Sequence, residues 1–307
     1  MKKIIIVIIL GLMLTGCTQV LKDPKGKSVP NPETNQTLTK NIICQPTNTK
    51  VKKIYTDNKI DYTKLPDCKK LTLTTDISSD LWTNVFIKPL AFILMKSANF
   101  FNNVGWAVIF TGIMIRLVFL PITKKTASQS ENMKKAKPEL DALEKKYKNK
   151  KDQDNLMKKN QEMMLIYKKY QINPVSGCLF AFIQLPIFFA FYEAINRVPA
   201  LFEGKFLWLN LGMTPLKGIS GGNFTYLILV LLLAVVTYYS FNFNKQDIIP
   251  GGDKNQNKVM MYFLLGFIIL ASFNLSTAIL LYWVTSSGFT ILQNIYVAKL
   301  GVKKNDK

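Results

Sequence analysis

Histidine is absent from this sequence of 307 residues. Its absence excludes a Ser-His-Asp triad, a Cys-His pair and imidazole-based zinc sites, so hydrolytic chemistry lacks its usual base. Cysteine is scarce as well, because only Cys17, Cys44, Cys68 and Cys178 occur and no two of them have the spacing of metal ligands. We therefore expect neither a histidine-dependent hydrolase nor a metal site built on histidine or on paired cysteines.

Arginine is nearly absent too. Of the 40 lysines and arginines, only Arg116 and Arg197 are arginines, and Arg116 lies in the otherwise apolar run Val104–Leu120. A guanidinium stays charged at any relevant pH, and an ionisable residue inside a bilayer segment costs about 2.5 to 3.5 kcal/mol, so by default it marks a functional site. The alternative is that Arg116 snorkels to the headgroups, because Lys124 follows only about 12 Å further along a helix.

The composition is that of a membrane protein. Apolar residues make up 49% of the chain and the mean hydropathy is +0.13, although the net charge is +21. Such a positive charge could also bind nucleic acid. The basic residues, however, lie between apolar runs and lack the interleaved aromatic residues that stack on bases. We expect no specific nucleic-acid sequence as a partner, and sorting of positive loops to the cytoplasm explains the charge better.

The N-terminus resembles a bacterial lipoprotein signal peptide over residues 1–16. Lys2 and Lys3 precede an apolar core too short to span a bilayer, and Leu14-Thr15-Gly16 leads into Cys17. We predict that Cys17 begins the mature chain and carries a covalent lipid, a diacylglyceryl group with an N-acyl chain such as palmitate. The alternative is an uncleaved anchor with an incidental cysteine.

Residues 17–78 are rich in Thr, Asn, Pro and Lys and show little periodicity. This composition predicts an irregular extracytoplasmic tether, partly disordered and without chemistry of its own. Cys44 and Cys68 could form a disulfide outside the cell or could be two free thiols, and the sequence does not decide between them. Cys178 is most simply a small buried apolar residue.

Residues 79–101 carry a different pattern. Leu81, Trp82, Val85 and Phe86 recur at helical spacing, which predicts an interfacial amphipathic helix that Pro89 interrupts. The alternative is the start of a fully buried helix.

Five apolar runs follow, each close to the ~20 residues that a bilayer requires except the short fourth run. The sequence therefore predicts an all-α integral membrane protein with a core at 102–298. Its transmembrane helices are expected at about 102–121, 176–196, 223–243, 259–273 and 277–298.

Charge predicts the topology of these spans. If the mature N-terminus is outside, residues 122–175, 244–258 and the basic tail 299–307 are cytoplasmic. Lys124–Lys169 contains fourteen lysines, whereas the outside loop Arg197–Gly222 contains three basic residues. Both the lipoprotein signal and the lysines therefore place the C-terminus in the cytoplasm of a bacterial cell.

The cytoplasmic segment 124–171 predicts a helical hairpin. Two regular apolar stripes flank the polar stretch KNKKDQD, with Pro138 kinking or restarting the first helix. The stripes comprise Ala136, Leu140, Leu143 and Tyr147, and Leu156, Met163, Tyr167 and Tyr170. The alternative is a solvated charged linker.

Three motifs in order, GIMIRLVFLPIT, NPVSGCLFAFIQLPIFFAFYEAI and LYWVTSSGFTILQNIYV, resemble those of the YidC/Oxa/Alb membrane insertases. The chain is most similar to their five-span, lipoprotein-type (SpoIIIJ-like) members in Gram-positive bacteria, over about Leu81–Ala298. The resemblance implies an insertase and chaperone for membrane proteins, with a hydrophilic groove that opens to the cytoplasm and the lipid but is closed toward the outside. It also implies that the protein is not an enzyme and needs no covalent chemistry, nucleotide, metal or other soluble cofactor. It implies that Arg116, Gln184 and Trp283 line this groove.

The resemblance also implies an apolar slide that contacts the client, with lipid contact or core packing as the alternative. Its candidate residues are Ile187, Phe191, Met260 and Phe263. Gln293 and Asn294 could line the groove mouth, although helix packing is favoured. The implied partners are nascent membrane proteins, the lipid bilayer and, through the hairpin lysines, the Sec translocon, ribosomes and signal-recognition components.

Two other classes of function compete with this interpretation. In a transporter or channel for an anionic solute, Arg116 would bind the solute, but the spans show no internal repeat. A structural lipoprotein scaffold would leave Arg116 and the hairpin unexplained.

Overall fold

The computed structural model of the chain describes residues 18–74, 80–149, 152–173, 176–243 and 254–305. The predicted signal peptide and Cys17 lie outside these residues. The described chain is helical and divides into two compact units. The first contains 18–114, Gln184–Leu233 and Ile269–Thr285, and the second contains Ile115–Ile183, Ala234–Ile268 and the residues from Ser286 on.

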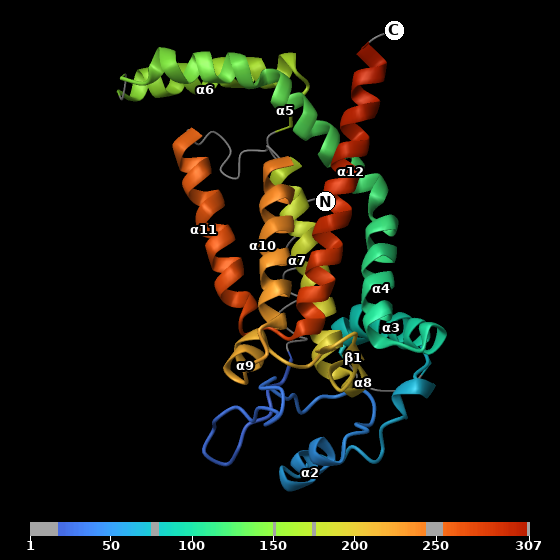
Figure 1. Cartoon of the computed structure of the whole chain (residues 1–307). Coiled ribbons are helices and arrows are strands. Elements are labelled where there is room, and N and C mark those ends of the chain that lie inside the picture. The colour runs from blue at the N-terminus through green and yellow to red at the C-terminus, as the bar shows by residue number, and fades with distance from the viewer. Residues whose placement is uncertain (1–17, 75–79, 150–151, 174–175, 244–253, 306–307) are drawn as a thin grey trace. The chain divides into compact units, whose positions relative to one another are not determined.

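Figure 1 shows the elements in their chain order. The α-helices are α2 (Thr49–Asp57), α3 (Lys88–Phe101), α4 (Val104–Val118), α5 (Leu120–Tyr147), α6 (Gln153–Lys169), α7 (Ser176–Arg197), α8 (Pro199–Phe202), α9 (Pro215–Ser220), α10 (Thr225–Phe243), α11 (Lys254–Ser272) and α12 (Thr277–Asn305). A 3-10 helix η1 (Cys68–Lys70) and a π-helix η2 (Thr83–Ile87) are also present. Strands β1 (Lys205–Phe206) and β2 (Leu209–Asn210) pair antiparallel.

The five predicted apolar runs fall on α4, α7, α10, α11 and α12. Among the described residues, only Thr225–Asn242 of α10 is long and apolar enough by itself to qualify as a span, while α4 and Gln256–Ser272 of α11 are apolar but shorter. The helical class of the fold is therefore confirmed, whereas the number of spans stays a prediction.

Two prolines lie in the first turns of helices. Pro89 was predicted to interrupt a helix, but the π-helix η2 runs directly into α3, and Ile87 and Lys88 both keep right-handed helical φ and ψ, so the chain stays helical through Pro89. Pro121 also lies in a first turn, that of α5, and α4 ends three residues before the predicted limit of its span. Between the two helices Phe119 leaves the helical conformation, with φ −86° and ψ 0°. Pro121 cannot donate the bond that would continue α4.

Residues 18–74 form a small folded region, which we call the N-terminal mini-domain. Isolated β-bridges join Val20 to Thr39 and Pro30 to Thr37, and Asn48 caps α2. A disulfide links Cys44 to Cys68, across 24 positions of sequence. This differs from the irregular tether that the composition predicted.

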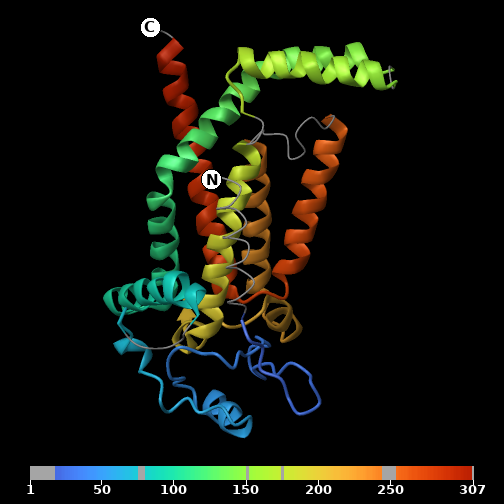
Figure 2. The ribbon, with the colours of Figure 1, turned by 180° about the vertical axis from the view of Figure 1, so that it is seen from behind.

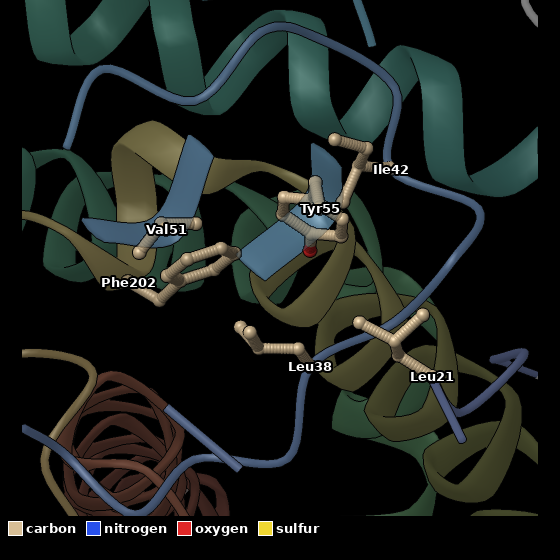
Figure 3. Close-up of a cluster of buried hydrophobic side chains, with 6 residues drawn as sticks. All are labelled: Leu21, Leu38, Ile42, Val51, Tyr55 and Phe202. Carbon is tan, nitrogen blue, oxygen red and sulfur yellow. The ribbon is translucent and has the colours of Figure 1, made fainter. Parts of the chain in front are cut away.

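The core of the mini-domain explains the difference. Its apolar residues lack periodicity because they come from loops as well as from α2, and they gather around Tyr55 and Phe202 (Figure 3). Phe202, which lies beside Val51, belongs to α8, far along the chain. The buried set is Leu21, Leu38, Ile42, Val51, Tyr55 and Phe202. A polar segment can thus fold when another part of the chain and a disulfide complete a small core.

In the second unit, α5 and α6 run side by side, as Figures 1 and 2 both show. The predicted helical pair is therefore present. Its buried cluster is Met133, Ala136, Tyr167 and Ile172, with Leu140, Met163, Ile166 and Tyr170 packed against it. Pro138 lies inside α5 and does not restart the helix. Leu156 departs from its predicted stripe, because 48% of it is exposed.

Candidate functional site: a polar face around Arg116

Arg116 lies in the last turn of α4 and is half-buried. Its Nε donates a hydrogen bond to Ser286 Oγ at 2.7 Å. Both residues belong to the second unit. The bond directs the guanidinium to α12, so the structure favours a fixed position over snorkelling towards Lys124.

Ser286 begins a polar face on α12. The side chains of this face recur at helical spacing in an otherwise apolar helix, and all of them are buried. They are Ser286, Ser287, Thr290, Gln293 and Asn294. The sequence prediction included only Gln293 and Asn294, at a groove mouth or in helix packing, although the helical spacing of the polar residues in TSSGFTILQN also indicates the other three.

Hydrogen bonds order this face. Thr290 Oγ1 donates to Ser286 O at 3.0 Å, a bond within α12. Thr123, in the first turns of α5, donates to Gln293 Oε1 at 3.1 Å. The start of the hairpin helix is therefore tied to the same face of α12 that holds Arg116. Buried polar groups are costly unless they are paired, so a face of this kind serves either interhelical bonding or a hydrated path.

Gln184 and Trp283, the other predicted groove residues, belong to the first unit. Both are half-buried, and the Trp283 ring packs edge-on against Phe188 with centroids 5.2 Å apart. Their place in a common groove with Arg116 stays a prediction.

The predicted slide residues divide into two groups. Phe191 is fully buried and stacks on Tyr282, with ring centroids 3.8 Å apart, so its assignment to a client surface is wrong for this conformation. Ile187 and Met260 are half-buried, while Phe263 is 66% exposed. Phe263 lies on an apolar face of α11, with Val259, Tyr262, Phe267 and Leu270 also exposed. This face can meet lipid or an apolar client helix.

Arg197, the second arginine, is predicted from the sequence only as a charge of the outside loop, whereas in the structure it forms a buried network. Its Nη1 lies 3.5 Å from Glu193 Oε2 and donates to Thr83 Oγ1 at 2.7 Å, and its Nε donates to Asn41 O at 2.9 Å. Trp82 Nε1 donates to the other carboxylate oxygen of Glu193 at 3.2 Å. The scarcity of arginine was the available signal, because five donors in a fixed fork distinguish arginine from lysine.

In the hairpin, Lys169 Nζ and the Tyr170 hydroxyl both donate to Glu139 Oε1, the latter at 2.8 Å. These bonds join α6 to α5. They lower the pKa of the Glu139 carboxyl from its ordinary value. Lys146 similarly pairs with Glu162 at 2.6 Å.

Comparison with known proteins identifies the family of this chain. Residues 96–305 match the sequence profile described as "60Kd inner membrane protein". The chain is 35% identical over 229 residues to membrane protein insertase YidC 2 of Bacillus anthracis, covering 73% of this chain and 84% of that protein. It is 32% identical over 240 residues to membrane protein insertase MisCA of Bacillus subtilis, covering 77% of this chain and 86% of that protein.

A solved structure supports the fold. The crystal structure of an active YidC insertase with its first transmembrane domain resolved is 23% identical to this chain and superposes with a TM-score of 0.52. The match covers 80% of this chain and 52% of that one, so this chain spans about half of the solved insertase. Taken with the matching profile and the similarity to the Bacillus proteins, the chain belongs to the 60Kd inner membrane protein family, the family of the YidC membrane protein insertases.

Proposed function

We propose that this protein inserts membrane protein clients through a hydrophilic groove whose positive charge is Arg116. The observation that supports this proposal most strongly is the half-buried guanidinium held by Ser286 on the polar face of α12. The charge attracts an acidic or polar segment of the client partway across the membrane. The client's apolar helix meanwhile leaves along apolar faces such as that of α11 into lipid.

The physical basis of the proposal is the cost of moving polar groups through hydrocarbon. Each unpaired backbone or side-chain polar group costs on the order of several kcal/mol in a bilayer core. A polar face inside the membrane shortens the low-dielectric path. No bond is made or broken in this process, so the protein acts without covalent chemistry.

The proposal includes the finer features expected from the sequence. α4, α7, α10, α11 and α12 form five spans, the mature N-terminus is outside with a lipid on Cys17, and Gln184 and Trp283 line the groove. The lysines of the α5–α6 hairpin face the cytoplasm, where they offer a contact for ribosomes, signal-recognition components or the Sec translocon.

Complementation tests this function. The host's own insertase is depleted, this chain is expressed, and insertion of a short single-span client with an acidic extracytoplasmic end is scored by protease protection. We expect wild type to restore insertion and Arg116→Ala to lose it. Arg116→Lys should retain part of the insertion activity, because lysine keeps the positive charge but lacks the planar guanidinium with its several donors. Lys124→Ala, which removes an exposed positive charge of the neighbouring helix, is the matched control and should behave as wild type.

Each result has a defined meaning. Rescue by both wild type and Arg116→Ala would keep the insertase and reject Arg116 as its central charge. Failure of the expressed wild type to rescue would favour the transporter or channel for an anionic solute.

A further inference from the structure

The N-terminal mini-domain is attached to the end of α7 by an ordered set of bonds. The backbone N–H of Ile43 donates to Arg197 O at 2.9 Å, and the Arg197 side chain donates to Asn41 O at 2.9 Å. One residue earlier, Asn196 accepts a bond from the Gln36 amide at 2.8 Å. All five residues belong to the first unit.

The attachment continues beyond α7. The Thr214 N–H donates to Thr34 O at 3.0 Å, and the Thr47 N–H donates to Glu203 Oε2 at 2.9 Å. Phe202 completes the core of the mini-domain. The segment 196–214 therefore forms a continuous platform, and the mini-domain is docked on it rather than suspended from a linker.

Arg197 is the residue on which this docking converges. Only 2% of Arg197 and 5% of Glu193 is exposed, and the guanidinium also reaches Thr83. It thereby joins three segments that are distant in sequence: the mini-domain, the π-helix η2 before α3, and α7. Removing one partner of a buried ion pair leaves the other without its partner and is strongly destabilising, so the docking depends on Arg197.

The mini-domain and the π-helix η2, which begins at Thr83, precede residue 96, where the family match begins. The docked region is therefore a feature of this chain that the family profile does not cover. In the proposed topology it lies at the outer ends of the spans, where a groove open to the cytoplasm must be closed.

We propose that the mini-domain is an outer cap of the insertase, and that Arg197 is the positioning residue that holds the cap in place. The role of the cap rests on the insertase function proposed above, whereas the role of Arg197 in docking does not. With the cap in place, water and ions do not pass the outer end while a client occupies the groove, and the client leaves sideways into lipid.

Hydrogen exchange of the full-length protein in nanodiscs tests the docking. In Arg197→Ala we expect exchange at least ~100-fold faster at the Ile43 and Thr214 amides, which bond across the docking surface. The Leu21 amide, which donates to Leu38 O inside the mini-domain, should keep more of its protection. Unchanged protection at Ile43 and Thr214 would overturn the role of Arg197.

Two further variants keep the test decisive if Arg197→Ala fails to fold. Thr83→Val removes the hydroxyl that accepts from Arg197 Nη1 with little change in side-chain volume, and we expect a smaller increase in exchange at the same two amides. Lys205→Ala removes an exposed positive charge from the platform and is the matched control, with exchange as in wild type. An equal effect of Lys205→Ala would reject a specific anchor.

The role of the cap has its own measurement. Proteoliposomes with Arg197→Ala should leak protons several-fold faster than wild type during client insertion, and Lys205→Ala should remain tight. If Arg197→Ala speeds amide exchange at the docking surface but does not increase the proton leak, the role of the mini-domain as a cap is wrong. The role of Arg197 in docking would still stand. If wild type inserts no client at all, the insertase proposal fails, and the exchange results still decide whether Arg197 docks the mini-domain.

Discussion

Arg116 and Arg197 show why two arginines occur in a chain that otherwise uses lysine. Arg116 places its Nε on a hydroxyl, and Arg197 divides its donors among a carboxylate, a hydroxyl and a backbone carbonyl. Directed bonds from several nitrogens require the planar fork, which a lysine ammonium lacks. At the residue scale, each arginine is therefore selected by the geometry of its partners and by its charge.

Ser286→Ala should weaken insertion without unfolding the protein. A hydrogen bond to a charged group contributes about 1.5 kcal/mol or more, so we expect insertion about tenfold slower because the guanidinium loses its fixed direction. The depletion assay described above measures this rate. Ser287→Ala, at the neighbouring buried position, is the control, and an equal loss there would show that polarity of α12 matters rather than the bond to Arg116.

Phe191→Ala should lower stability rather than client binding. The fully buried ring stacks on Tyr282, and removing a buried phenylalanine costs about 3 to 5 kcal/mol. Thermal unfolding in detergent measures the loss, and Phe189→Ala, at an exposed neighbouring position, should change the melting temperature little. A photo-crosslinker at position 191 that captures clients as efficiently as one at Phe263 would contradict the buried assignment.

At the scale of elements, the hairpin is held by a narrow apolar seam together with bonds between the helices. Glu139 on α5 accepts from Lys169 and Tyr170 on α6, so its carboxylate form is favoured by the paired helices. A carboxyl whose pKa is lowered in the folded state stabilises it above the ordinary pKa of 4.5, and loses this effect as the pH falls through the lowered value.

The hairpin should therefore loosen in acid through Glu139. We expect amide protection in α5 and α6 to be greater in wild type than in Glu139→Gln at pH 6, and this difference to vanish as the pH falls below 4.5. Comparing the two proteins at each pH cancels the intrinsic change in exchange rate. A difference that persists undiminished at pH 3 would show that the charge of Glu139 is not the cause.

At the scale of the whole molecule, the mini-domain depends on both a disulfide and a distant part of the chain. The Cys44–Cys68 bond closes a loop of 24 positions, and Phe202 fills the core from α8. Small folded regions with so little core rely on such covalent closure.

Removing the disulfide should loosen the mini-domain. We expect Cys44→Ser with Cys68→Ser to lower its free energy of unfolding by about 2 to 4 kcal/mol, seen as faster amide exchange at Leu21 and Leu38. Reductant added to wild type should reproduce the effect and should not change the double variant. Protection equal to wild type in the double variant would show that the platform alone holds the mini-domain.

The sequence by itself determined the apolar helices and marked Arg116 as a candidate residue. Periodicity and apolar runs are local properties, and a helix satisfies its backbone hydrogen bonds within one segment, so both ends of α4, α7 and α10 could be predicted within three residues. The polar ends of two helices could not: α11 begins five residues before its predicted span, and α12 ends seven residues after its predicted span. A lone arginine in an apolar run is likewise visible without any knowledge of neighbours.

Only the tertiary structure decided which side chains meet. Gln36 and Asn196 are bonded across 160 positions of sequence, Phe202 completes the core of a polar N-terminal segment, and Phe191 turns inwards to Tyr282. No local sequence pattern encodes these pairs, because the burial and hydrogen bonding of a residue depend on which distant segment packs against it. The Arg197 network and the core of the mini-domain both depend on such tertiary contacts. For this reason the sequence showed an arginine at position 197 but not the segments to which it bonds.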